Sequence, residues 1–228
     1  MEIEIEDWLY QELEHRKKVL GYNSINELLV DYIIRRAPPI ALERQAVKGI
    51  HELIKSMKLD EELPIDVAID EVAFRAATKY GYLITSVSKL EGTILELLVV
   101  KFLEEEGLDF VYKAPQVGYG YSKGILNASN QFGLPDISFG LNGKLIGVIE
   151  VKKQEVFRMT YYDKLKLSYY IKKGLQAHLI TTAPLPQRSK FYTELVDAGI
   201  AIHHVHIIKN LREAVKLVRE KAITSTKC

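Results

Sequence analysis

The chain has 228 residues, a net charge of +1 and an apolar fraction of 47%, which allows one domain with a sizeable core and a smaller second one. It contains no run of 18 apolar residues, and its acidic start lacks the apolar region of a signal peptide, so we expect neither a membrane span nor an export signal. The single cysteine, Cys228, excludes disulfides within the chain and cysteine-based zinc sites, which favours a cytoplasmic protein.

Charge is distributed unevenly along the chain. Residues 1–110 carry 13 basic and 22 acidic side chains, whereas residues 111–228 carry 18 basic and 8 acidic ones. Lysines on solvated helices account for part of the basic excess. A difference of this size nevertheless indicates a second half that is suited to a phosphate backbone.

Residues 1–37 predict a small module of their own. Glu and Ile alternate over residues 1–6, which predicts a short strand, and an amphipathic helix over Trp8–Leu20 follows. A second helix over residues 25–36 has a capping residue in Ser24. This order resembles a ribbon-helix-helix module, which implies a homodimer. The outward glutamates would repel phosphates, so dimerisation is favoured over DNA reading; a plain helical hairpin is the alternative.

Two further helices are expected within residues 38–84, at 40–57 and 63–80, and we interpret this part as a helical linker. Residues 85–228 alternate helices and strands, which is typical of an α/β fold with a mixed sheet and helices on both faces. The pattern predicts helices at residues 88–106, 161–173, 188–198 and 210–221, and strands at residues 109–114, 136–141, 144–152, 176–182 and 200–208.

The helix expected over residues 88–106 is apolar nearly all round, which indicates burial, yet it contains Glu96. Burying an unpaired carboxylate is costly, so Glu96 needs a lysine or a metal site as its partner, unless it emerges at a helix edge. The histidines at 203, 204 and 206 show no third ligand, and a place on the strand surface is favoured over metal binding.

Several residues of the second half are candidates for contact with nucleic acid. The stretch over residues 115–132 is rich in Gly, Tyr, Ser and Asn, and there Tyr121 and Lys123 could act by stacking and charge. An ordinary surface loop is the alternative interpretation of this stretch. Further candidate cations follow it in the chain, namely Lys153, Lys164 and Lys166.

The strongest chemical signal is the stretch over residues 134–153, which predicts a strand, a turn and a second strand. Glu150 and Lys152 are two residues apart and therefore share a face of the second strand, while Asp136 begins the first. Two carboxylates and the backbone carbonyl of Val151 suit Mg²⁺ or Mn²⁺, which can polarise a phosphate and acidify water. Lys152 is placed to orient that water and to stabilise developing charge. Strand-end charges that simply meet solvent are the alternative.

Strand register decides whether the two carboxylates meet, because opposed residues of an antiparallel pair share a face. A two-residue turn at Asn142-Gly143 would set Asp136 opposite Ile149 and away from Glu150. We therefore predict a three-residue loop or a bulge, either of which places Asp136 opposite Val148 or Glu150. A clean two-residue turn would count against the site.

With Glu96, Asp136, Glu150 and Lys152 in place, the chain resembles the PD-(D/E)xK nuclease superfamily over about residues 88–208. It is most similar to archaeal Holliday junction resolvases, in which a glutamate begins a helix that ends in Glu-Gly. The resemblance implies a restriction-endonuclease-like fold with Asp136 and Glu150 as direct metal ligands. It also implies Glu96 as an additional metal-site carboxylate and Lys152 as the catalytic lysine.

The function that this resemblance implies is a Mg²⁺-dependent DNA endonuclease, with Mn²⁺ as a substitute, acting on branched or other DNA. Its domain would cover residues 85–228, and the N-terminal part has no counterpart in the resolvases. The layout points to an archaeon or an archaeal virus, and so to the cytoplasm of the organism or its host. A non-catalytic DNA-binding protein that keeps the fold is the alternative, and an RNA-processing nuclease is a third interpretation.

Overall fold

The computed structural model describes residues 7–20, 23–25, 39–80, 87–113 and 133–226. The chain divides into two compact units, Met1–Leu42 and Glu43–Cys228. In the first unit, helix α1 (Asp7–Leu20) confirms the first predicted helix. The expected strand at residues 1–6 and nearly all of the second helix lie outside the described residues. The ribbon-helix-helix interpretation and the homodimer therefore stay predictions.

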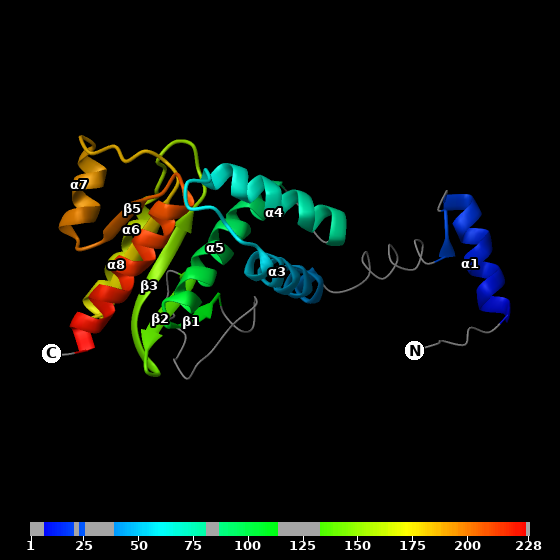
Figure 1. The fold of residues 1–228 in the computed structure, drawn as a ribbon, viewed down its shortest axis with the longest axis horizontal. Coiled ribbons are helices and arrows are strands. Elements are labelled where there is room, and N and C mark those ends of the chain that lie inside the picture. Colours follow the sequence, from blue (N-terminus) through cyan, green and yellow to red (C-terminus); the bar gives the residue numbers. More distant parts are fainter. Residues whose placement is uncertain (1–6, 21–22, 26–38, 81–86, 114–132, 227–228) are drawn as a thin grey trace. The chain divides into compact units, whose positions relative to one another are not determined.

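A mixed β-sheet lies at the centre of the second unit (Figure 1). Among the described residues it has five strands in the order β1-β2-β3-β4-β5, with the first three antiparallel and β4 and β5 parallel to β3. The expected α/β class is confirmed. The strands are β1 (Asp109–Tyr112), β2 (Ile137–Leu141), β3 (Lys144–Lys152), β4 (Gln176–Thr181) and β5 (Ala201–His204).

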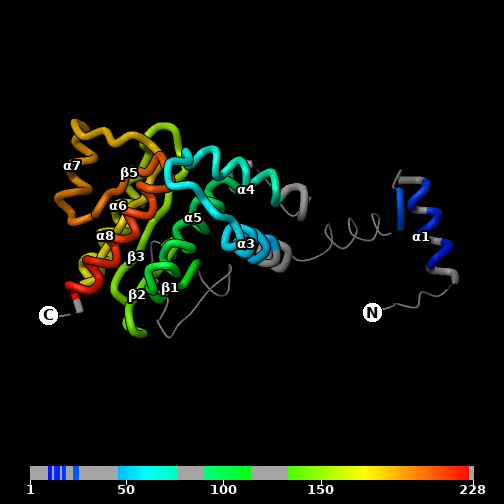
Figure 2. Tube along the Cα trace, in the orientation of Figure 1, coloured from blue at the N-terminus to red at the C-terminus, as the bar shows by residue number. Residues whose placement is uncertain are grey.

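Helices cover both faces of this sheet, as its sequence requires. Helices α5 (Val87–Glu105) and α8 (Ile208–Thr226) pack on one face, where Ile149 of β3 is buried, and lie side by side (Figure 2). Helices α6 (Tyr161–Lys172) and α7 (Lys190–Asp197) pack on the other face, where Val148 is buried. Alternate residues of β3 thus enter two different cores, which explains its nearly continuous apolar run.

Helices α3 (Pro39–Ser56) and α4 (Ile65–Tyr80) are the two helices expected within residues 38–84. Ile54 of α3 and Ile69 of α4 are buried in the same core as α5, and the backbone N–H of Ile65 donates to the carbonyl of His206 at 2.9 Å. From Glu43 onward this region therefore belongs to the unit that holds the sheet, because its apolar faces complete the core around α5. Across the described residues, no helix has the length and apolar character needed to cross a membrane.

The turn between β2 and β3 has two residues, Asn142 and Gly143, and Leu141 pairs directly with Lys144. Both turn residues have positive φ, 53° and 77°, which is the conformation of the tight hairpin turn that Asn-Gly favours. The alternative of a three-residue loop is therefore wrong.

A bulge in the same hairpin shifts the strand pairing by one residue before the open end of the hairpin, where Asp136 and Glu150 lie. The pairing shifts between Phe139 and Gly140 and leaves Ile146 of β3 without a counterpart on β2. Continuing the register beyond this shift sets Asp136 opposite Glu150. The predicted bulge is confirmed, and it restores the face-sharing of the two carboxylates that the two-residue turn alone would prevent.

Candidate active site

Asp136 is fixed by backbone groups on both sides of its strand. Its Oδ2 accepts a hydrogen bond from the backbone N–H of Val151 at 2.8 Å. Its carbonyl oxygen accepts one from the backbone N–H of Lys113 at 2.8 Å. The carboxylate therefore stays at the end of the hairpin beside β3, on the side that the bulge determines.

Glu150 is the most deeply buried charged group of the site, with only 2% of its surface exposed. Its Oε1 lies 2.6 Å from the ammonium of Lys166 and 3.1 Å from that of Lys152. Its Oε2 is buried and has no hydrogen-bond partner in the described part of the chain. A buried oxygen of this kind is costly unless something else binds it.

Lys152 is held between two carboxylates from different elements. Besides Glu150, it lies 3.4 Å from Oδ1 of Asp163. Asp163 occupies the first turn of α6, where it and Thr160 form a reciprocal capping box. The cap that starts α6 therefore also positions the lysine of the site.

Glu96 joins the site from α5, and a lysine supplies the partner that its burial required. Its Oε2 accepts a hydrogen bond from the hydroxyl of Tyr112 at 2.5 Å and lies 3.0 Å from the ammonium of Lys113. Both partners come from the end of β1. Helix α5 and the first strand are thereby fixed together next to Asp136.

The electrostatics of the site follow from this crowding of carboxylates. Burial raises the pKa of Asp136 to about 8, with further contributions from the charges of Glu150 and Glu96, and the N–H of Val151 offsets only part of the rise. Burial alone would lower the pKa of Lys152, but the surrounding carboxylates outweigh it and raise that pKa above its ordinary value. Lys152 is therefore an ammonium at neutral pH, a proton donor and positive charge rather than a base.

The fit of a metal ion can be judged from the donors. Within the described ranges, no three His, Cys, Asp or Glu side chains form a group that could hold a metal ion. Mg²⁺, however, commonly uses only one or two carboxylates and completes its shell with water and phosphate oxygens. Asp136 and Glu150 provide two such carboxylates. The unpartnered Oε2 and the raised pKa of Asp136 both indicate negative charge that lacks sufficient neutralisation.

The residues expected to contact nucleic acid have different surroundings. Tyr121 and Lys123 lie outside the described residues. Lys153 pairs with Asp66 at 2.9 Å, and Lys164 pairs with Glu194, so both lysines have acidic partners at the surface. Their contact with phosphate stays a prediction.

Lys166 takes a different place from the one expected of a phosphate contact. Its side chain is buried on the inner face of α6 and points into the site. Sequence reasoning also missed Asp163 as a partner of Lys152. The Thr160-x-x-Asp163 capping pattern, with a lysine three residues further on, is the signal that could have indicated both.

Two of the histidines considered as metal ligands, His203 and His204, lie on β5. Nε2 of His203 is 3.1 Å from Nδ1 of His178, a buried residue of β4, and their rings stack. Burial lowers the pKa of His178 to about 3 and that of His203 to about 4, so both are neutral near pH 7. His178 was not anticipated from the sequence.

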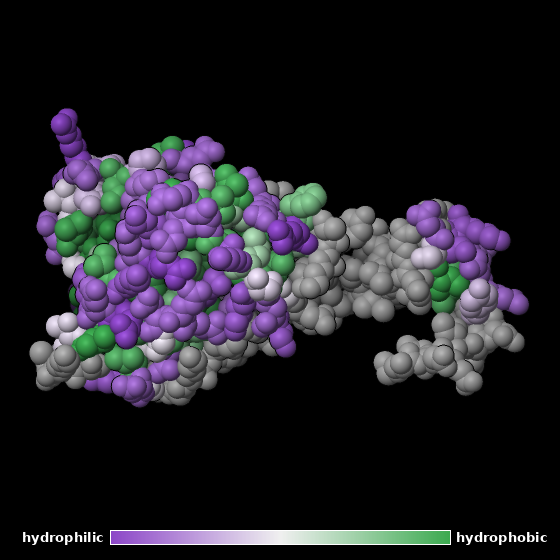
Figure 3. Space-filling view, viewed as in Figure 1, coloured by the Kyte–Doolittle hydropathy of each residue, from purple (hydrophilic) through white to green (hydrophobic). Residues whose placement is uncertain are grey.

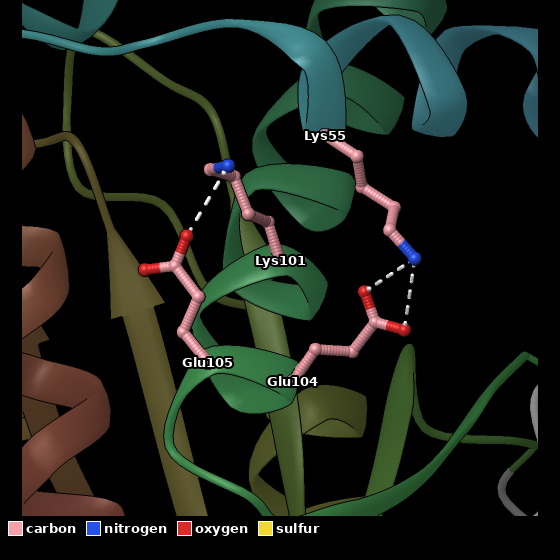
Figure 4. A pocket seen from close by; sticks show the side chains of 4 residues that line it. All are labelled: Lys55, Lys101, Glu104 and Glu105. Carbon is pink, nitrogen blue, oxygen red and sulfur yellow. Dashed lines mark hydrogen bonds and ion pairs between the residues drawn. The ribbon is translucent and has the colours of Figure 1, made fainter.

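A hollow lies between α3 and α5 and is lined by Lys55, Lys101, Glu104 and Glu105 (Figure 4). Lys55 pairs with Glu104 and Lys101 with Glu105, each at 3.2 Å. The charges of this hollow thus neutralise one another. The face of the second unit seen in Figure 3 is mainly hydrophilic, with apolar residues scattered between hydrophilic ones.

Comparison with known proteins adds little to this geometry. No family model and no curated protein matches the chain. One similar solved structure is SfsA of Pyrococcus furiosus in complex with Ca²⁺, at 15% identity and a TM-score of 0.34, covering 51% of this chain and 56% of that one. Another is protein VC1899 of Vibrio cholerae, at 14% identity and a TM-score of 0.39, covering 85% and 54%. The chain spans about half the length of these two structures.

Proposed function

We propose that the protein is a metal-dependent DNA endonuclease that hydrolyses phosphodiester bonds. The observation that carries the proposal is the bulge in β3, which sets Asp136 opposite Glu150 at the end of a buried strand, where Glu150 contacts Lys152. The basic excess of residues 111–228 supports a nucleic acid as the substrate.

The carboxylates of Asp136 and Glu150 would hold a Mg²⁺ or Mn²⁺ ion, with the carbonyl of Val151 as a third oxygen donor. Such an ion supplies Lewis-acid polarisation of the phosphate and makes a water molecule more acidic. Glu96 adds negative charge close to Asp136, which favours a cation there. Tyr112 keeps Glu96 in place through its hydroxyl.

Lys152 contributes a fixed positive charge. Glu150 and Asp163 hold its ammonium from two sides, so the group is oriented before substrate arrives. In hydrolysis it donates to the attacking water or to the phosphate oxygens, where negative charge increases in the transition state. Because its pKa is raised, it does this throughout the neutral range.

The proposal is tested by cleavage of a labelled four-way junction, a linear duplex and a single strand, each with Mg²⁺, Mn²⁺ or EDTA. We expect metal-dependent cleavage that Glu150→Ala abolishes, with the preferred substrate naming the type of nuclease. Glu155→Ala is the matched control, because Glu155 is exposed and lies just beyond the same strand.

Salt-sensitive DNA binding without cleavage of any substrate would refute the proposal. That outcome would favour the non-catalytic DNA-binding protein instead. Normal cleavage by the Asp136→Ala variant would also contradict the assignment of the site.

A further inference from the structure

We propose that Lys166 is an internal counter-ion of Glu150 that competes electrostatically with a divalent cation for this carboxylate, so that Lys166 sets the metal affinity of the site. The inference rests on the proposed function. It assigns a positioning role to a residue outside the Asp, Glu and Lys motif.

The position of Lys166 is fixed by the packing of α6. Leu167 and Tyr170 lie on the same buried face of that helix, and the hydroxyl of Tyr170 donates to the carbonyl of Gly133 at 3.2 Å. The ammonium of Lys166 lies 3.5 Å from the carbonyl of Leu134, and the residue as a whole is only 7% exposed. Helix α6 thus holds a buried cation against the segment that leads into Asp136.

The ion pairs of the site show what Lys166 does there. Lys113 pairs with Glu96, and Lys152 is shared between Glu150 and Asp163. Of the two lysines that contact Glu150 among the described residues, Lys166 makes the shorter contact, 2.6 Å to Oε1. It therefore offsets part of the negative charge of the carboxylate that a metal ion would use.

A divalent cation that binds Glu150 meets the ammonium of Lys166 at close range. Like charges about 4 Å apart repel strongly in a partly buried site. Lys166 on Oε1 therefore opposes the binding of a cation at the unpartnered Oε2 of the same carboxylate. Removing the ammonium should strengthen cation binding, because the carboxylate then lacks its internal competitor.

The direction of the change in cation affinity separates competition from a merely structural role of Lys166. If Lys166 only kept Glu150 ordered, its loss would loosen the site and weaken cation binding. A disturbed fold would weaken binding as well. Tighter binding is expected from competition alone.

The experiment is a titration of the metal-free full-length protein with Mn²⁺, followed by the paramagnetic resonance of free Mn²⁺, without DNA. We expect Lys166→Met to bind Mn²⁺ about tenfold more tightly than wild type, which corresponds to the loss of one ion pair of about 1.4 kcal/mol. Lys166→Arg keeps the charge and should bind like wild type. Lys172→Met, at an exposed position of the same helix, is the matched control.

Circular dichroism checks the fold, and Lys166→Gln replaces Lys166→Met if the latter does not fold. Unchanged or weaker Mn²⁺ binding by the neutral variant overturns the inference. The proposed function survives that result if Glu150→Ala abolishes the binding seen in wild type. If wild type binds no Mn²⁺, the proposed metal site itself fails, and the inference fails with it.

Discussion

The buried carboxyl of Asp136 should make the metal-free protein less stable as the pH rises. Its ordinary pKa is 3.8, and burial next to Glu150 and Glu96 raises the pKa to about 8. A pKa raised on folding gives stability that is complete below the unfolded value and is lost as pH rises through the folded value. The relevant window therefore extends from about pH 4 to pH 8.

The size of the stability loss follows from the difference between the folded and unfolded pKa values of Asp136. Each pH unit between the two pKa values costs about 1.4 kcal/mol of the free energy of unfolding, so the cost reaches roughly 4 kcal/mol at pH 7. Asp136→Asn cannot ionise, and its amide oxygen can still accept from the N–H of Val151. We expect this variant to be more stable than wild type at pH 7, by as much as roughly 4 kcal/mol.

Urea unfolding in EDTA at pH 5, 6, 7 and 8 measures this difference. The advantage of Asp136→Asn should grow with pH, and added Mg²⁺ should reduce it by stabilising wild type. Asp163→Asn is a control of opposite sign: burial acts to raise the pKa of Asp163, but hydrogen bonds from Thr160 and the ammonium of Lys152 hold it below its ordinary value. That variant should lose stability at neutral pH. A difference between wild type and Asp136→Asn that is independent of pH would refute the reasoning.

Three further predictions concern single residues. Gly147→Ala should lower the free energy of unfolding by about 1–3 kcal/mol, because a Cβ there would lie 2.6 Å from Cζ of Phe139 and 2.7 Å from a backbone oxygen of β4. Urea unfolding measures this difference, and an unchanged midpoint of unfolding would contradict the prediction. Lys152→Met should abolish cleavage in gel assays and leave DNA binding intact, and cleavage near the wild-type rate would argue against its role. Folding lowers the pKa values of His178 and His203, so the stability that these residues contribute is fully present above pH 6.5. Below pH 6.5, the free energy of unfolding should fall by up to about 1.4 kcal/mol per pH unit for each residue. His178→Phe should flatten this acid loss in pH-dependent unfolding.

Much of the fold was predictable because local patterns determine it. The period-two pattern and the Asn-Gly turn located β2 and β3. The parity of the hairpin required either a three-residue loop or a bulge, and the structure has the bulge. The helix predicted over residues 161–173 is α6 (Tyr161–Lys172). Burial of Glu96 in an apolar helix indicated that it needs a partner, and Lys113 provides one.

Other features could not be predicted because they depend on contacts between distant segments. Periodicity shows which face of α6 is buried, but not that Lys166 on this face meets Glu150. The apolar faces of α3 and α4 look alike in sequence whether they cover a core or a partner, so the sequence does not show that they pack around α5. Strand β5 ends at His204, four residues before the predicted end, because His206 instead accepts a hydrogen bond from Ile65.

The single extra residue in β3 has a consequence for how insertions and deletions in this hairpin should be interpreted. Side chains alternate faces, so gaining or losing one residue between Asp136 and Glu150 turns one carboxylate to the opposite side, even if every motif residue is kept. Gaining or losing two residues keeps both carboxylates on the same face of the sheet. In related sequences, an odd-length gap here is therefore a chemical change equivalent to substituting a carboxylate, whereas an even-length gap alters only the length of the hairpin.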